Sequence, residues 1–215
     1  YVLEWLQSHR SEAPLPPRGT ILTKFLFQPF DMLKRLGFTQ EQEQEALAVG
    51  SRALAAAAPE QSEASVGRAK GMLVVESFLP GTEAEEKLRP GDVLLEVGGE
   101  PCLDFACLEA KLDARVEATV PLRVSRAGEL VDVELKAVDL HALIPFDFVE
   151  CAGGVFHQLS YHTCKRYHIT LADRGVFVAQ SGFGFGLELP YHAVVVGVGG
   201  TQVQSLKDFE MVLAG

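Results

Sequence analysis

The side chains best suited to chemistry in this sequence are three histidines and one cysteine that lie close together along the chain. They are His157, His162, Cys164 and His168. Imidazole and thiolate groups are ligands that zinc prefers. The histidines, however, follow one another at spacings of five and six positions, which does not place three ligands on one helical face, and no HExxH motif occurs. Packed or surface histidines are therefore the favoured interpretation, and we expect no metal and no other cofactor.

A nucleophilic serine is the second possibility. A trypsin-like hydrolase needs its serine in a Gly-Xaa-Ser-Gly-Gly context beside an oxyanion hole, with a histidine and an aspartate elsewhere. Ser181-Gly182 follows Gln180 without the flanking glycines, so we expect no catalytic residues in this chain. The glycines of Gly197-Val198-Gly199-Gly200 lack GxGxxG spacing and a following helix N-terminus, which argues against phosphate binding.

The four cysteines occur without CxxC spacing. They are Cys102, Cys107, Cys151 and Cys164. Cys102 and Cys107 lie five positions apart in an apolar stretch, where packed thiols are the favoured interpretation and a metal site or a disulfide is the alternative. This cysteine usage indicates a reducing, intracellular compartment.

The bulk composition describes a globular chain with an acidic surface. The chain has 215 residues, 47% of them hydrophobic, which is enough for one large or two small domains. Its 29 acidic side chains outnumber 19 basic ones, and the net charge of −10 repels phosphate backbones, so no nucleic-acid partner is expected. The apolar runs are too short to span a bilayer, and we expect neither a membrane span nor a secretory signal.

The first third of the chain carries signals for a linker, a strand, a helix and an insertion. Residues 1–17 are typical of the end of an upstream helix followed by a proline-rich linker. The β-rich run 20–27 and a short helix over 31–36, ended by Gly37, follow. Residues 40–70 are rich in Gln, Glu and Ala, and we expect a mobile insertion there, its first part suited to a helix.

The middle of the chain places short strands around one helix. Turn signals at Pro90-Gly91-Asp92 and Gly98-Gly99 enclose a short strand. The segment 104–114 predicts an amphipathic helix with Phe105, Leu108 and Leu112 on its apolar face. The other expected elements are strands at 72–77, 121–125 and 130–135 and a helical turn at 83–88. Because strands outnumber helices, the predicted fold class is α+β, mostly β.

The second half of the chain repeats the first. Val97-Gly98-Gly99 recurs as Val198-Gly199-Gly200, an offset of 198 − 97 = 101. The strand Gly71–Val75 is echoed by Gly175–Ala179. At the offset of 101, the helix positions Phe105, Leu108, Glu109 and Leu112 correspond to Leu206, Phe209, Glu210 and Leu213. This order predicts two copies of one unit, of which the second, 141–215, is C-terminally incomplete.

The turn-strand-turn segment resembles a PDZ domain. Leu88-Arg89-Pro90-Gly91-Asp92-Val93-Leu94, followed by Val97-Gly98-Gly99, is similar to the xLxxGDxIxxxNG pattern of the PDZ domains in HtrA/Deg serine proteases. Gly98 stands where asparagine is usual, and since both residues reach positive φ, the turn is expected to persist. The resemblance implies two PDZ-like partial barrels, each with one main amphipathic helix.

A closer resemblance covers nearly the whole chain. Arg18-Gly19-Thr20-Ile21 and Gln28-Pro29-Phe30-Asp31 are similar to the first PDZ domain of the large eukaryotic Nma-type branch of HtrA proteases. Phe156-His157-Gln158-Leu159-Ser160-Tyr161 and Arg174-Gly175-Val176-Phe177-Val178 resemble its divergent PDZ-like domain. The implied organisation is a PDZ domain at 18–140 and a PDZ-like domain at 141–215.

The resemblance also implies a peptide groove between a strand edge and the amphipathic helix. Backbone N–H groups of a loop would hold a peptide's terminal carboxylate, and an apolar pocket would take its last side chain. The implied binding residues are Thr20, Ile21, Leu22, Thr23, Phe25, Leu108 and Leu112. Leu22 stands near the place of a family glycine, so an internal-strand mode remains a rival to carboxylate capture. The alternative for Ile21, Phe25, Leu108 and Leu112 is a purely structural place in the core.

The second copy has a weaker case for a groove. Its loop would be Cys151–Val155, and a structural role is favoured there.

The expected function is non-catalytic recognition of hydrophobic C-termini or exposed strands for an HtrA-type protease, which the chain would also regulate. The alternative is an assembly module that mediates oligomerisation without binding peptides. Expected partners are peptide or unfolded-protein substrates, an upstream protease domain and further copies of the protein. The resemblance implies a nuclear or plastid location.

Overall fold

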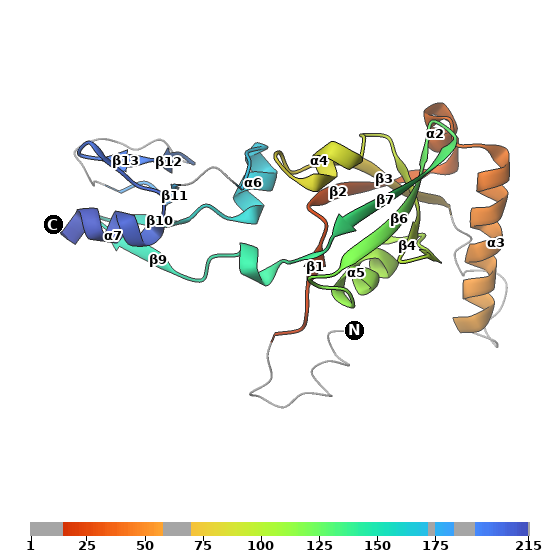
Figure 1. Cartoon of the computed structure of the whole chain (residues 1–215), viewed down its shortest axis with the longest axis horizontal. Coiled ribbons are helices and arrows are strands. Elements are labelled where there is room, and N and C mark those ends of the chain that lie inside the picture. Colours follow the sequence, from red (N-terminus) through yellow and green to blue (C-terminus); the bar gives the residue numbers. More distant parts are fainter. Residues whose placement is uncertain (1–14, 58–69, 172–174, 183–191, 215) are drawn as a thin grey trace. The chain divides into compact units, whose positions relative to one another are not determined.

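The computed structural model describes residues 15–57, 70–171, 175–182 and 192–214 (Figure 1). The chain forms two compact units, one within Tyr1–Phe78 and Glu83–Asp139 and the other within Leu79–Thr82 and Leu140–Gly215. Strands outnumber helices among the described residues of each unit. The coarse prediction of a mixed, mostly β fold is therefore confirmed. The predicted helix end and most of the linker, residues 1–14, lie outside the described residues.

One antiparallel sheet organises the first unit, with strands in the order β2-β3-β4-β6-β7. These strands are β2 (Thr23–Pro29), β3 (Gly71–Phe78), β4 (Val93–Val97), β6 (Thr119–Arg126) and β7 (Glu129–Lys136). The short strand β5 (Glu100–Pro101) pairs with β4, and β1 (Gly19–Thr20) pairs with β8 (Val138–Asp139). The strand predicted over 20–27 is thus two strands, because the chain turns at Leu22, whose φ is 57°.

Helices cover both faces of this sheet. Successive residues of β3 point in opposite directions, so alternate residues are buried under different helices. Leu73 and Val75 belong to the core under α5 (Phe105–Asp113), to which α4 (Glu83–Lys87) adds Ala84. Met72 and Val74 belong to a second core on the other face. The uninterrupted apolar run of β3 therefore reflects burial on two sides.

The second core is closed by two helices and a turn. Phe30 and Leu33 come from α2 (Phe30–Leu33), which continues as the 3-10 helix η1 (Lys34–Leu36) and ends at Gly37 with φ of 88°. Ala46 comes from α3 (Gln40–Ala57), the first part of the segment predicted to be an insertion. Residues 58–69, the rest of that segment, lie outside the described residues.

A capping box explains where α3 begins. The Thr39 hydroxyl accepts the Gln42 N–H at 3.2 Å, and the Gln42 side-chain oxygen accepts the Thr39 N–H at 3.0 Å. This Thr-x-x-Gln pair satisfies two backbone donors that the first turn of a helix leaves unpaired. The helix is therefore encoded locally, although its burial depends on the sheet.

Asp92 ties the Pro90-Gly91-Asp92 turn to the sheet. Its side chain is 1% exposed and accepts the Arg89 N–H at 2.9 Å. The Arg126 guanidinium of β6 binds both carboxylate oxygens, Nε to Oδ1 at 2.9 Å and Nη2 to Oδ2 at 2.7 Å. These hydrogen bonds raise the pKa of Arg126. This bidentate ion pair fixes the start of β4 against β6.

The second unit contains a smaller antiparallel sheet in the order β12-β11-β10-β9. Its strands are β9 (Phe148–Cys151), β10 (Gly154–Gln158), β11 (Val176–Gln180) and β12 (Val194–Val195), and the separate hairpin is β13 (Gly197–Val198) with β14 (Thr201–Gln202). Its helices are η2 (His141–Leu143), α6 (Tyr161–Tyr167) and α7 (Leu206–Ala214). Phe156 and Phe209, with ring centroids 4.9 Å apart, lie at the centre of its core.

Two helices and two turns of the structure follow the spacing of the predicted internal repeat. Helices α5 and α7 begin at 105 and 206 and end at 113 and 214, so both bounds differ by 101. The Asp104 carboxylate accepts the Cys107 N–H at 2.8 Å, and the Ser205 hydroxyl accepts the Asp208 N–H at 3.1 Å, which caps both helices at equivalent positions. The Gly98-Gly99 and Gly199-Gly200 turns both have positive φ throughout.

The predicted alignment of the strand in the first copy with the strand in the second copy is wrong by one residue. The sequence alignment of Gly71–Val75 with Gly175–Ala179 uses an offset of 104. In the first unit Leu73 and Val75 belong to the core that includes α5. In the second unit Val176 and Val178 belong to the core that includes α7. The structural offset is therefore 178 − 75 = 103. A shift of one residue exchanges the two faces of a strand, so only the packing reveals the correct register.

No helix among the described residues is both long enough and apolar enough to cross a membrane.

Replacing Asp92 with Ala is expected to lower the free energy of unfolding of the first unit by about 3 kcal/mol, because it leaves Arg126 and the Arg89 N–H without their acceptor. Asp132→Ala is the matched control, since Asp132 also binds an arginine, Arg123, at 2.8 Å but has 75% of its side chain exposed. We expect a loss below about 1 kcal/mol for it. Urea denaturation followed by circular dichroism measures both, and equal losses would contradict the role given to Asp92.

Candidate peptide-binding site

The outer edge of β2 is the feature of the first unit that can accept another strand. β2 is the terminal strand of the sheet and pairs with β3 on one side. Within the described residues, no strand pairs with its other side. A strand edge with unpaired N–H and C=O groups is a template for an added extended segment.

Helix α5 lies next to this edge. It contacts β1, the two residues that precede the loop into β2. Leu108 and Leu112 of α5 share one buried cluster with Ile21 and Phe25. The edge strand and the helix therefore contribute side chains to the same apolar core.

Hydrogen bonds and close packing hold the start of the edge to the end of the helix. The Gly19 N–H donates to Asp113 Oδ1 at 2.7 Å. A Cβ on Gly19 would lie 2.2 Å from the Leu112 carbonyl oxygen, so only glycine fits there. Asp113 Oδ2 has no hydrogen-bond partner among the described residues, but the Arg18 guanidinium lies 3.5 Å away and balances its charge. Asp113 is 5% exposed, which makes this contact a buried anchor.

The loop between β1 and β2 satisfies part of its own backbone. Leu22 adopts the left-handed conformation, with φ of 57°, and its N–H donates to the Thr20 hydroxyl at 3.1 Å. The Thr23 hydroxyl donates to the Ile21 carbonyl at 3.1 Å. A non-glycine residue in this conformation costs roughly 1 kcal/mol.

The structure brings all seven predicted binding residues together where β1, β2 and α5 meet. Thr20 and Leu22 are half-buried. The other five are almost fully buried, with exposed fractions of 4% for Ile21, 9% for Thr23, 7% for Phe25, 5% for Leu108 and 5% for Leu112. The apolar members therefore lie in the core, which was the alternative interpretation. Their contact with a peptide stays a prediction.

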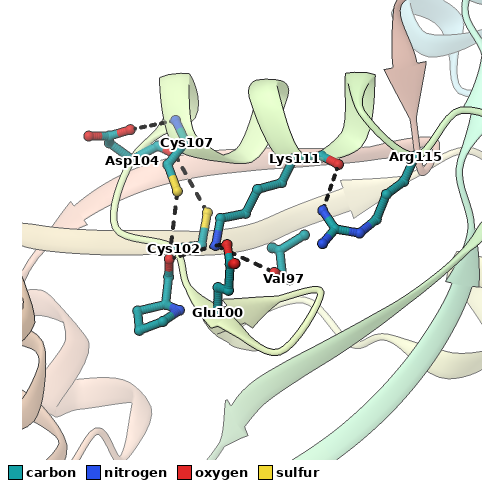
Figure 2. Close-up of polar contacts among 8 residues, drawn as sticks. Val97, Glu100, Cys102, Asp104, Cys107, Lys111 and Arg115 are labelled. Carbon is teal, nitrogen blue, oxygen red and sulfur yellow. Dashed lines mark hydrogen bonds and ion pairs between the residues drawn. The ribbon is translucent and has the colours of Figure 1, made fainter.

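Lys111 fastens the opposite side of α5, a contact that the sequence did not indicate (Figure 2). Its ammonium group donates to the carbonyl oxygens of Pro101 at 3.0 Å and Val97 at 3.5 Å, and lies 3.1 Å from the Glu100 carboxylate. The hydrogen bond and the positive charge of Lys111 lower the pKa of Glu100. The Arg115 guanidinium donates to the backbone carbonyl of Lys111 at 3.2 Å.

The thiols of Cys102 and Cys107 pack between α5 and the β4–β5 hairpin (Figure 2). Cys102 is fully buried, and its sulfur lies 3.8 Å from the Asp104 carbonyl oxygen. The Cys107 sulfur lies 3.6 Å from the Pro101 carbonyl oxygen. Burial strongly raises the pKa of Cys102, and the neighbouring Cys107 adds to this rise. Cys102 is therefore a protonated core thiol rather than a nucleophile, as the packed-thiol interpretation expects.

The histidines that suggested a metal site lie in different environments. The His157 ring, on β10, is 5.2 Å from the Phe177 ring, and the His162 ring, on α6, is 5.5 Å from the Tyr161 ring. His168 follows α6 in a left-handed conformation with φ of 53°. In the described part of the chain, no three potential ligands gather.

An antiparallel sheet whose edge strand lies beside an amphipathic helix is the architecture of PDZ-type interaction domains, and the comparisons with known proteins agree. The family model described as a PDZ-like domain matches residues 142–215. Pro-apoptotic serine protease nma111 of Neosartorya fischeri is 43% identical over 171 residues, 80% of this chain and 15% of that protein. Pro-apoptotic serine protease NMA111 of Coccidioides immitis is 37% identical over 182 residues, 85% of this chain and 16% of that protein.

These matches place the chain in the PDZ region of the HtrA-type serine proteases of the Nma111 kind. The chain spans about 15% of the length of the curated relatives that it matches. A solved structure, HtrA-type protease AlgW with decapeptide, overlaps 57% of this chain and 30% of its own with 16% identity and a TM-score of 0.35.

Leu22→Gly tests the strain assigned to the loop. Glycine reaches positive φ without cost, so the substitution is expected to change the free energy of unfolding by less than about 1 kcal/mol. Leu26→Gly, in the regular part of β2 and 38% exposed, is the matched control. It should cost about 1 kcal/mol more than Leu22→Gly, because a glycine in a strand only adds freedom to the unfolded chain. Chemical denaturation compares them, and a larger loss for Leu22→Gly would refute the assignment.

Proposed function

We propose that the first unit binds an extended peptide segment along the outer edge of β2, beside α5. The observation that carries this proposal is the edge itself, whose second side has no strand partner among the described residues. Main-chain hydrogen bonds to the edge would supply affinity, and neighbouring side chains would supply selectivity. The anchors at Asp113 and Lys111 support it, because they hold α5 at a constant place beside the edge.

An exposed strand is a better ligand for this edge than a terminal carboxylate. The Leu22 N–H, one of the amides that would hold a carboxylate, already donates to the Thr20 hydroxyl. The side chains expected to line a pocket for the last residue, Leu108 and Leu112, are each only 5% exposed and belong to the same core as Ile21 and Phe25. Backbone pairing along β2 needs neither group to move.

The relatives support a proposal for the wider role. We propose a PDZ domain at 18–140 and a PDZ-like domain at 141–215, each a partial barrel with one main amphipathic helix, in the non-catalytic part of a protease. Relatives that cover most of this chain are named serine proteases, and no catalytic serine motif occurs in it. Unfolded or peptide substrates would bind here and be cut by an upstream domain. The four free cysteines support a reducing, intracellular compartment, which we propose is the nucleus or a plastid.

A hydrophobic peptide of about ten residues, titrated into the chain and followed by NMR, tests the binding mode. Amide shifts are expected for residues 20–28 and 105–113. The free-acid and C-terminally amidated peptides should bind with equal affinity within about twofold, which is a difference below roughly 0.5 kcal/mol. A much weaker amidated peptide would show carboxylate capture instead, and shifts confined to other residues would refute the site.

Leu108→Val, a mild change in the core that Leu108 of α5 shares with Phe25 of β2, should loosen the packing that positions the edge and weaken peptide binding at least about threefold, or roughly 0.6 kcal/mol. Phe209→Leu is its matched control, because Phe209 holds the equivalent position of α7. Both remove a little buried volume, so both should lose some stability, but only Leu108→Val should change the affinity. Equal affinity for both variants and the wild-type chain would remove Leu108 from the site.

Assembly is the second candidate function, and one surface of the second unit favours it. Phe146 and Phe148 are 71% and 60% exposed, an unusual state for neighbouring aromatic residues. If they join copies of the protein, Phe146→Ser with Phe148→Ser should shift the sedimentation coefficient of the chain to that of a monomer. An unchanged sedimentation profile would count against assembly through this surface.

A further inference from the structure

The edge strands of the two units can be matched residue by residue. Phe25 on β2 pairs with Val75, and Phe156 on β10 pairs with Val178. Val75 and Val178 are equivalent by the offset of 103. The register also slips at equivalent places, between Lys24 and Phe25 and between Val155 and Phe156. β2 and β10 are therefore the same element, with an offset of 156 − 25 = 131.

The offset aligns the loops that precede the two strands. Ile21 and Leu22 correspond to Ala152 and Gly153, and each pair alone connects two strands. Leu22 and Gly153 are both left-handed, with φ of 57° and 76°. The predicted loop of the second copy, Cys151–Val155, is thus in the right place, but it is a hairpin turn rather than a ligand loop.

The two loops differ at their first residue. Ala152 has φ of 46°, whereas Ile21 does not have positive φ. Two successive left-handed residues form the type I′ turn that folds one strand back onto the next. Isoleucine is branched at Cβ and resists this conformation strongly, while alanine tolerates it at modest cost.

The chain consequently takes different routes before the two strands. In the second unit β9 doubles back and pairs with β10 through four successive residue pairs, from Gly154 with Cys151 to His157 with Phe148. In the first unit β1 leaves β2 and pairs with β8. β9 therefore covers the edge of β10 that corresponds to the open edge of β2.

Side chains and packing hold β9 in that position. Val149 and Cys151 pack against the core that contains Phe209 of α7. By the offset of 131, Val149 corresponds to Arg18, whose charged group instead pairs with Asp113. The turn is also enclosed: a Cβ on Gly182 would lie 2.1 Å from the Gly154 nitrogen, and the Gln180 side chain donates to the Gly153 carbonyl at 3.4 Å.

We infer that β9 occupies the edge of the second unit at which a peptide would otherwise add. The difference between Ala152 and Ile21, which hold equivalent positions, then decides which unit accepts a peptide. The inference rests on the proposed function for its peptide-binding part. It assigns one strand-addition site to this chain, on β2, and makes the second unit a self-complemented copy.

Hydrogen exchange on the whole chain tests the pairing without any ligand. The amides of β9 and β10 should be protected in the wild-type chain. Ala152→Ile should speed their exchange at least about tenfold, whereas Ala152→Asn should not, because asparagine accepts positive φ. Equal exchange in both variants, or unprotected β9 amides in the wild-type chain, would overturn the inference. If Ala152→Ile also exposes β11 and α7, the covalent variant below decides.

A covalent lock tests where the peptide binds. Phe148 and His157 are cross-strand partners, so Phe148→Cys with His157→Cys should form a disulfide in oxidised glutathione, with Cys151 changed to Ser in both the variant and its control. The locked chain should bind the hydrophobic peptide at one site with unchanged affinity. Failure to form the disulfide, or loss of binding on locking, would overturn the inference. Absence of peptide binding by the wild-type chain would refute only the proposed function, since the exchange and disulfide results still report on β9.

Discussion

A tight two-residue hairpin needs positive φ at its first central residue, and a side chain branched at Cβ resists that conformation. This constraint acts at the same place in both halves of the chain, directly before the edge strand. Where Ala152 and Gly153 satisfy it, the preceding segment folds back and completes the sheet. Where Ile21 stands first, the segment departs toward β8, and the edge of β2 stays free of strands within the described residues. A single backbone conformation thus separates a closed edge from an open one.

The open edge is useful only if the helix beside it keeps its place. Most of the contact between α5 and the sheet is apolar and has little directional preference. Polar contacts at two points add the direction: Asp113 binds Gly19 at the end of the helix, and Lys111 binds the β4–β5 hairpin along its side. Gly19 contributes by having no Cβ, which lets its backbone approach the Leu112 carbonyl. The helix cannot slide along β2 without breaking a buried charged contact, which is costly.

The buried state of Ile21, Phe25, Leu108 and Leu112 bears on how such an edge can select a ligand. Because these side chains belong to the buried core, they stabilise the unit and leave the backbone edge as the accessible group. A ligand that pairs through its main chain meets a preformed surface, whereas one that inserts a side chain must first displace part of a close-packed core. The first route costs less conformational free energy, so the packing favours extended segments over a buried terminal residue.

Much of the fold could be predicted from local patterns. The turns at Gly91 and Gly98-Gly99, the helix with Leu108 and Leu112, the 121–135 hairpin and the 101-residue repeat all appear in the structure, because turn chemistry and periodicity act over a few residues. The break at Leu22 and the true register of the β3 echo were missed. The break depends on a non-glycine residue that adopts the left-handed conformation. The register depends on which face of the strand is buried, and a continuous apolar run does not record that.

The candidate site, like the fold, was predicted only in part from the sequence. The sequence by itself determined which residues meet around β2 and α5, since the motif resemblance places Thr20–Phe25 beside Leu108 and Leu112. Only the tertiary structure decided that these apolar side chains are core, that Asp113 binds an amide 94 positions away, and that β9 covers the edge of β10. Contacts between residues so far apart leave no periodic trace along the chain, because they depend on how whole strands and helices pack.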